Sequence, residues 1–250
     1  GGIERLQAAG IAVSVGPLEA AARALNAGFY SRMERGRPFI RLKLAMSLDA
    51  RTAPAAPAAA GRRWITSEAA RADVQCFRAR SGAILTGAGT VRSDDPRLDV
   101  RMAYGPWIRQ PLRVLLDPML SCPATAKLFD GGGALVFAAP DAPLRDQDRA
   151  RVERLARAAG GLDLHAVIAR LNELEINELL VECGPRLAGS FVLSNLVDEF
   201  VLYVAPTLLG ADAAPLLHVG GLRAQGSLPA FEFKDVQRIG PDLRLILTPK

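Results

Sequence analysis

The chain has few of the residues from which proteins build metal sites. Its 250 residues include three cysteines and two histidines. The cysteines, Cys76, Cys122 and Cys183, are too scattered to give a metal-ligand spacing, so we expect no bound metal. Aromatic residues make up only 6% of the sequence, whereas hydrophobic residues make up 50%. An aliphatic core large enough for one large domain is therefore predicted.

Long apolar runs and a secretion signal are also lacking. No stretch approaches the roughly 18 apolar residues of a membrane span, and Asp198, Pro206 and Asp212 interrupt the most hydrophobic region. The first residues contain no apolar signal core. The net charge of +5 is spread over helical faces, which favours small anionic ligands over nucleic acid. We expect a cytoplasmic protein with no membrane partner and no nucleic-acid partner.

A strand-to-helix junction is the most informative local feature. Residues 178–183 are typical of a β-strand, and Gly184 with Pro185 then begins an amphipathic helical pattern. Gly184 permits close approach of a ligand, Pro185 suits a first helical position, and free amides at a helix start bind anions. Glu182 lies at the carboxyl end of the strand, where open α/β sheets bind ligands. The pattern indicates a phosphate cradle, although an ordinary βα turn has the same local signature.

A second candidate element is the strictly alternating segment 39–49. One face is aliphatic and the other carries polar side chains, as expected for a strand that forms the wall of a site. A half-exposed edge strand with solvated charges would show the same alternation. The aliphatic face consists of Ile40, Leu42, Leu44, Met46 and Leu48, and the other of Arg41, Lys43, Ala45, Ser47 and Asp49.

The remaining patterns alternate between strands and helices, which predicts an α/β fold with a mostly parallel sheet flanked by helices and a C-terminal antiparallel hairpin. Ser67 is a good N-cap for the helix that follows it. Residues 53–60 form a low-complexity Ala/Pro loop. Helices are expected over residues 17–35, 67–79, 146–158 and 165–174, and strands over 83–86, 112–116, 134–138, 199–205, 231–239 and 242–247.

Four motifs occur together in one order: Lys43-Leu44-Ala45-Met46-Ser47-Leu48-Asp49, Trp64-Ile65-Thr66-Ser67, Thr90-Val91-Arg92-Ser93-Asp94-Asp95-Pro96-Arg97-Leu98 and Glu182-Cys183-Gly184-Pro185. Their order and spacing resemble the riboflavin-biosynthesis reductases, most closely the C-terminal reductase half of the bifunctional RibD deaminase/reductase, over residues 37–247. The resemblance implies a dihydrofolate-reductase-like fold. It also implies NADPH-dependent reduction of 5-amino-6-(5-phosphoribosylamino)uracil to 5-amino-6-(5-phosphoribitylamino)uracil.

The resemblance also implies roles for individual residues. Lys43 and Glu182 are the expected catalytic residues, Lys43 as an electrostatic or proton-donating group. Substrate-binding residues are expected at Arg62, Arg78, Leu98, Arg101 and Glu182, with the arginines on the sugar phosphate. Cofactor-binding residues are expected at Ala45, Trp64, Thr90, Asp94 and Pro118, and along the cradle at Gly184, Pro185, Arg186, Leu187, Ala188, Gly189 and Ser190.

By the same resemblance, residues 1–36 are an N-terminal helical segment and linker remnant of an absent deaminase domain, and residues 37–250 form the reductase domain. The zinc signature of such a deaminase cannot be assembled from three scattered cysteines, so we expect the deaminase on a missing N-terminal part. A homodimer is also expected. The chain departs from the family at Ala50, which replaces a common glycine, and in its longer Ala/Pro loop before Trp64.

Two other interpretations remain open. A related reductase acting on a pterin-type heterocycle would need a buried carboxylate but no phosphate-binding arginines. A non-catalytic nucleotide-binding regulatory module would keep the cradle and lose the polar wall. A lone arginine is usually a solvated surface residue, Trp64 would alternatively be core packing, and Asp94 would alternatively cap a helix or form a turn.

Overall fold

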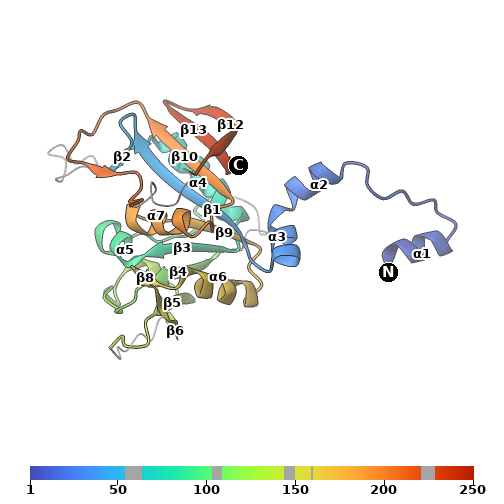
Figure 1. Ribbon diagram of the computed structural model, residues 1–250, viewed down its shortest axis with the longest axis horizontal. Coiled ribbons are helices and arrows are strands. Elements are labelled where there is room, and N and C mark those ends of the chain that lie inside the picture. Colours follow the sequence, from blue (N-terminus) through green and yellow to red (C-terminus); the bar gives the residue numbers. More distant parts are fainter. Residues whose placement is uncertain (54–63, 103–108, 144–149, 159, 221–228) are drawn as a thin grey trace.

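The computed structural model describes residues 1–53, 64–102, 109–143, 150–158, 160–220 and 229–250 (Figure 1). A nine-stranded sheet runs through the molecule, parallel from β10 to β6 and antiparallel at β13 and β12. The mostly parallel sheet and the terminal hairpin are thereby confirmed. Its strands, in spatial order, are β12 (Phe231–Ile239), β13 (Asp242–Pro249), β10 (Glu199–Ala205), β1 (Phe39–Ser47), β9 (Glu178–Glu182), β3 (Ala83–Gly87), β4 (Leu112–Leu116), β5 (Ala134–Ala138) and β6 (Ala150–Arg154).

Helices cover both faces of this sheet and give the protein two hydrophobic clusters. The residues of β9 alternate between them: Leu179 and Val181 pack in the cluster that contains α6 (Leu164–Glu173) and α7 (Pro185–Leu193). Leu180 packs in the cluster of α4 (Glu68–Arg80) and α5 (Ala88–Asp94) on the other face. Smaller elements complete the fold: β2 (Arg51–Ala53) paired with β11 (Ala214–Pro215), β7 (Arg157–Ala158) paired with β8 (Gly161–Leu162), and the 3-10 helix η1 (Lys127–Phe129).

Strand β1 lies in the interior of the sheet, between β9 and β10. The edge-strand interpretation of residues 39–49 is therefore wrong, and the alternation has another cause. The aliphatic side chains face α6 and α7, whereas the polar ones face α4. Arg41 is only 3% exposed because it is paired with Glu178 of β9 and Glu199 of β10. Leu48, beyond the end of β1, is exposed.

The prediction of a helix over residues 146–158 is wrong for the part of this segment that the structure describes. Residues 150–154 form β6, which extends the sheet in parallel beside β5, and β7 follows. Tertiary contacts outweigh the charged, helix-like composition, because the open edge of β5 supplies backbone hydrogen-bond partners. Arg154 also donates to the carbonyls of Ala139 (2.8 Å) and Ala142 (2.9 Å), which hold the strand end in place. Residues 144–149 lie outside the described part.

The helical pattern over residues 17–35 divides into α2 (Glu19–Leu25) and α3 (Ala27–Arg35). The break falls at Asn26, whose side-chain amide donates to the Ala22 carbonyl at 2.9 Å and so competes with the helical backbone. α1 (Gly2–Ala8) and α2 contain no buried residue, and in Figure 1 they extend away from the sheet. Within the described ranges, no helix is long and apolar enough to span a membrane.

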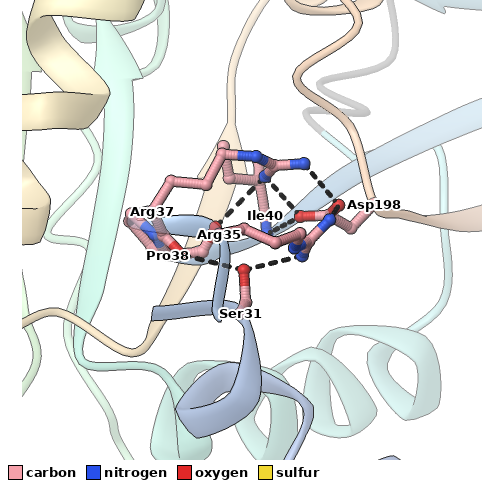
Figure 2. Close-up of polar contacts among 6 residues, drawn as sticks. All are labelled: Ser31, Arg35, Arg37, Pro38, Ile40 and Asp198. Atoms are coloured by element: carbon pink, nitrogen blue, oxygen red, sulfur yellow. Dashed lines mark hydrogen bonds and ion pairs between the residues drawn. The ribbon is translucent and has the colours of Figure 1, made fainter. Parts of the chain in front are cut away.

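An ionic cluster around Asp198 fixes α3 to the beginning of β1 (Figure 2). The Asp198 carboxylate accepts two 2.7 Å hydrogen bonds from Arg37, one of 2.7 Å from Arg35 and one of 2.8 Å from the Ile40 backbone N–H. Ser31 donates to the Arg37 carbonyl at 2.7 Å. Residues on both sides of position 36 thus contribute to one polar cluster, which lies at the amino end of β1, whereas Lys43 lies at the middle of that strand.

The C-terminal hairpin is fastened to the start of α4. The Asp242 carboxylate, which is 1% exposed, accepts hydrogen bonds from the Ser67 backbone N–H (2.8 Å) and hydroxyl (2.7 Å). Ser67 is the N-cap of α4, as predicted, and accepts a hydrogen bond from Ala70 N. Arg244 of β13 binds Asp73 of α4 at 3.0 Å. The hairpin therefore helps to position the helix that carries Arg78.

Candidate active site

Several predicted site residues meet at the carboxyl ends of the parallel strands. Lys43 of β1 lies opposite Glu182, the last residue of β9, in the strand register. Glu182 directly precedes the Gly184–Pro185 junction that begins α7, and β3 ends beside β9 at Gly87. The polar wall and the cradle, which were identified separately in the sequence, thus form one site at the edge where open α/β sheets bind ligands.

Arg78 reaches this site from α4 and binds Glu182 in a bidentate pair. Its Nε lies 2.6 Å from Glu182 Oε1, and its Nη2 lies 3.0 Å from Oε2. Nη1 donates to the Asp99 carbonyl at 3.0 Å. Arg78 is 8% exposed, and three of its five N–H donors are used within the protein. This geometry favours a role in fixing Glu182 over the predicted role as a phosphate ligand.

The pair also keeps Glu182 ionised. Burial acts to raise the pKa of the Glu182 carboxyl, but the charge and hydrogen bonds of Arg78 outweigh it, with a smaller contribution from Lys43, so the pKa is lowered. For the Lys43 ammonium the balance is reversed. Burial lowers its pKa, opposed by the Glu182 charge and assisted by that of Arg78. The site therefore holds a stable carboxylate next to an amine whose proton is easier to release than usual.

Arg101 differs from Arg78 in its surroundings, although the sequence assigns both to the same task. The Arg101 side chain is 61% exposed, and its Nε lies 3.2 Å from Asp99 Oδ1. Its backbone N–H donates to Gln75 at 2.9 Å, which fixes the main chain and leaves the guanidinium facing solvent. Leu98 is 1% exposed and packs with α4 and α5. Arg101 is thus the arginine that is available to an arriving anion.

The start of α7 has the features of an anion cradle. Gly184 is the N-cap and has no side chain with which to cap the helix, and Pro185 occupies the first turn. A Cβ atom at position 184 would meet only Thr90 Oγ1, at 3.8 Å, among the described residues. Thr90, on α5, therefore lies next to the start of α7. Arg186 is exposed in the same turn.

Further along α7 the side chains and backbone are engaged within the protein. Leu187 packs on the core cluster of α7, Ala188 is buried in it, and Ser190 donates to the Arg186 carbonyl at 3.1 Å. A Cβ atom on Gly189 would lie 2.0 Å from the His218 carbonyl oxygen. Gly189 is thus required for close packing between two backbone segments of the protein, which is a different reason for a glycine than the predicted ligand contact.

The remaining residues that are predicted to bind the cofactor differ in their exposure to solvent. Trp64 is 51% exposed, which excludes the core-packing alternative, and the Arg71 guanidinium lies 5.5 Å from its ring centroid. Asp94 is exposed as the last residue of α5. Ala45 packs partly buried on the α4 face. The Pro118 carbonyl accepts a hydrogen bond from Ala139 N at 3.0 Å. Arg62 lies outside the described residues.

Sequence reasoning missed a polar network beneath Lys43. The Tyr203 hydroxyl donates to Asp73 at 2.6 Å, and Arg244 binds the same carboxylate. The Lys43 ammonium lies 5.7 Å from the centroid of the Tyr203 ring. These residues come from β10, α4 and β13, which are far apart in the sequence, so no local spacing could have connected them. The one signal available was the alternation of β10, which places Tyr203 on the same face as Lys43.

Asp49, the last residue of the first motif, holds a loop in place. It accepts hydrogen bonds from the Ser47 hydroxyl, from Leu209 N at 3.2 Å and from Gly210 N at 2.7 Å. The Ser47 hydrogen bond, with the backbone amides, lowers the pKa of Asp49 to about 2. The motif therefore contains one site residue, Lys43, and one residue that fixes the turn after β1.

We predict that Ala50→Gly stabilises the protein. Ala50 has a left-handed φ of +55°, and its backbone is held by hydrogen bonds from its N–H to the Ser47 carbonyl and from Leu216 N to its own carbonyl. An L-residue is strained there, so glycine should raise the free energy of unfolding by about 0.5–1 kcal/mol in urea titrations. Ala53→Gly, in strand β2, is the control and should lower it by a similar amount. Equal losses for both variants would refute the strain.

Comparison with known proteins decides the family. The RibD C-terminal domain profile matches residues 38–245. The chain belongs to the RibD C-terminal domain family. It is 40% identical to the riboflavin biosynthesis protein RibD of Escherichia coli, over 98% of this chain and 69% of that protein. The membership predicted from the four motifs is thereby confirmed.

Two further members of the family, one a curated protein and one a solved structure, agree with this assignment. The 5-amino-6-(5-phosphoribosylamino)uracil reductase of Buchnera aphidicola (subsp. Acyrthosiphon pisum) is 33% identical over 75% of this chain, which covers 96% of that protein. A crystal form of Acinetobacter baumannii RibD, called form 2, has a TM-score of 0.86 and 35% identity, covering all of this chain and 68% of that one. The predicted RibD-type reductase fold is therefore also confirmed.

Proposed function

We propose that this chain reduces 5-amino-6-(5-phosphoribosylamino)uracil to 5-amino-6-(5-phosphoribitylamino)uracil, with NADPH as the reductant. The name of the Buchnera relative supports the reaction, and that protein consists almost entirely of the region that matches this chain. The observation that carries the proposal is the cluster of Lys43, Glu182 and Arg78 directly in front of an uncapped helix start. It combines a fixed carboxylate, an amine and an anion cradle in one site.

The residues at the site fit a phosphorylated dinucleotide. Gly184 and Pro185 begin a helix at which Gly184 provides no side-chain cap, so the backbone N–H groups of Gly184, Arg186 and Leu187 are available, which is the arrangement that binds phosphate oxygens. Thr90 would offer its hydroxyl beside them, and half-exposed Trp64 a flat apolar surface for a ring. The cofactor, when bound, supplies the hydride. The protein's contribution is to orient the two reactants.

The substrate is assigned to the polar wall. Arg101 is exposed and would bind the sugar phosphate. Glu182 is held as a carboxylate by Arg78 and would accept hydrogen bonds from the amino groups of the pyrimidine or the hydroxyls of the opened sugar. Lys43 would hold a proton near the atom that gains charge when the sugar opens, and its lowered pKa favours proton transfer.

The two alternatives are less consistent with this site. A pterin reductase would have use for the buried Glu182 carboxylate, but Arg78 already neutralises that carboxylate and exposed Arg101 has no role in it. A regulatory module would have no need for an amine beside a carboxylate. We further propose a cytoplasmic homodimer, with the deaminase activity in the part of the longer relatives, about a third of their length, that this chain does not match.

The test follows the absorbance of the reduced nicotinamide. Loss of absorbance is expected with the phosphoribosylamino substrate and NADPH, with catalytic efficiency at least roughly tenfold higher than with NADH. Dihydrofolate should give no turnover. Equal efficiency with NADH would reject the cofactor preference, whereas turnover of dihydrofolate alone would favour the pterin reductase. A dephosphorylated substrate should bind about ten- to a hundredfold more weakly, because the contact with Arg101 is lost.

A further inference from the structure

Lys43 projects from the central strand β1 toward a single aromatic ring. Its Nζ lies over the Tyr203 ring, 5.7 Å from the centroid. Tyr203 is on the neighbouring strand β10, opposite Ala45, and is completely buried. Among the described residues, Nζ has no hydrogen bond or ion pair. The negative face of the ring therefore gives Nζ a stabilising contact on the protein side of the site.

The ring is held in place more firmly than packing alone requires. The Tyr203 hydroxyl donates to Asp73 of α4 at 2.6 Å. Arg244 of β13 binds the same carboxylate at 3.0 and 3.1 Å, and its other nitrogen binds Asp235 (3.0 Å) and Gln237 (2.7 Å). Burial raises the pKa of the Tyr203 phenol, with the Asp73 hydrogen bond adding to it, so the phenol stays neutral and keeps donating. The orientation of the ring is thus fixed from three elements.

Other charged groups act on Lys43 from around the ring. Glu182 of β9 favours the ammonium form, while Arg78 of α4 opposes it. Arg101 is farther out and also acts on Glu182. Because burial and Arg78 both disfavour the charged amine, an aromatic face fixed beneath it adds to the support that Glu182 gives the ammonium form.

We propose that Tyr203 is a positioning residue that orients the Lys43 ammonium and keeps it protonated through its ring face, and that Asp73 and Arg244 hold this ring. The catalytic part of this inference rests on the function proposed above. The structural part does not, since it concerns an interaction within the free protein. The two parts can therefore be tested separately.

The direct test measures the Lys43 pKa by NMR of ¹³C-labelled lysine. The chain has four lysines, at positions 43, 127, 234 and 250, so Lys43→Arg assigns the signal. Tyr203 is replaced by phenylalanine and then by phenylalanine carrying one, two or three ring fluorines. Each added fluorine reduces the negative potential of the ring face while the size of the ring stays nearly constant. With Tyr203→Phe as the reference, which already lacks the hydroxyl, we expect a downward trend in the Lys43 pKa with fluorination that reaches about one pH unit. A flat series would overturn the proposal.

A matched control and a kinetic readout complete the design. The same fluorinated residues at Phe231, which packs against Phe200 with ring centroids 4.9 Å apart, should leave the Lys43 pKa unchanged. A shift there equal to that at position 203 would count against a specific contact.

In the wild type and the Tyr203 series, the high-pH limb of the kcat/KM profile should move with the measured pKa. If the NMR trend appears and the limb stays fixed, Tyr203 positions Lys43 but the proposed role of Lys43 in the reaction is wrong.

Discussion

Replacing Arg78 with alanine should lower the free energy of unfolding by about 3–5 kcal/mol, because it leaves a buried carboxylate without its partner. Arg78 and Glu182 are joined by two hydrogen bonds of 2.6 and 3.0 Å, and Arg78 is only 8% exposed. Urea titrations of wild type and variant at neutral pH would measure the loss. Reductase activity should fall as well, because Glu182 is no longer oriented.

The stability loss caused by Arg78→Ala should depend on pH, and the direction of this dependence follows from the pKa of Glu182. In the wild type the folded-state pKa of Glu182 lies below its ordinary value of 4.5, so its stabilising contribution is present above that value and is lost as the pH falls through the folded pKa. Without Arg78, burial raises the folded-state pKa, and protonation then favours the folded state. The deficit of Arg78→Ala should therefore shrink as the pH is lowered toward 5.

Arg101→Ala is the matched control, because it removes the same kind of side chain from an exposed position. Its stability should change by no more than about 0.5 kcal/mol. Its Michaelis constant for the phosphorylated substrate should rise roughly ten- to a hundredfold, with NADPH binding nearly unchanged. Similar stability losses for the two variants would contradict the division of roles between a supporting and a substrate-binding arginine.

Gly184→Val should weaken NADPH binding by roughly a hundredfold or more while the protein stays folded. Gly184 has an ordinary φ of −76°, and the nearest described atom to an added Cβ is 3.8 Å away, so the chain can accept the side chain. The valine would instead occupy the space in front of the helix amides, where we propose that a phosphate binds. Fluorescence titration with NADPH, after a thermal melt to verify folding, would measure the effect.

Gly189→Ala distinguishes a cradle from a packing position on the same helix. An alanine Cβ there would overlap the His218 carbonyl at 2.0 Å, so this variant should be destabilised whether or not NADPH is present. Retained NADPH affinity in folded Gly184→Val would mean that the start of α7 is an ordinary βα turn. Loss of folding in Gly184→Val, comparable to that in Gly189→Ala, would contradict the open space at position 184.

The sequence was most informative where local patterns and motifs agree. The alternation of residues 39–49, the strand-to-helix junction at Gly184 and the terminal hairpin all have the predicted type. The helix prediction for residues 146–158 failed because charged residues suit a solvated helix as well as an exposed strand. The interaction that decides the structure is the pairing of residues 150–154 with the open edge of β5. That edge exists only after the sheet has formed, so no window of the sequence can indicate it.

Within the site, residue type and motif singled out both Lys43 and Glu182, and the register of β1 and β9 places these two residues opposite each other. The distinction between Arg78 and Arg101 could not be predicted, because it depends on burial and on which carboxylate each one meets. The polar support of Tyr203 was equally inaccessible, because Asp73 is 130 residues from Tyr203 and 171 residues from Arg244 in the chain. Tertiary packing, and not residue identity, assigns these roles.

The attachment of the last strand to α4 has a consequence for the order in which the protein forms during synthesis. Asp242 binds Ser67, the N-cap residue of α4, and Arg244 lies opposite Tyr203 in the strand register and binds Asp73. Asp242 and Arg244 follow Ser67 and Asp73 by 175 and 171 residues, so the helix that carries Arg78 gains these supports only after β13 has been synthesised. The sheet can begin to assemble on the nascent chain, but the face that carries α4 is completed only once β13 has emerged and paired with β10.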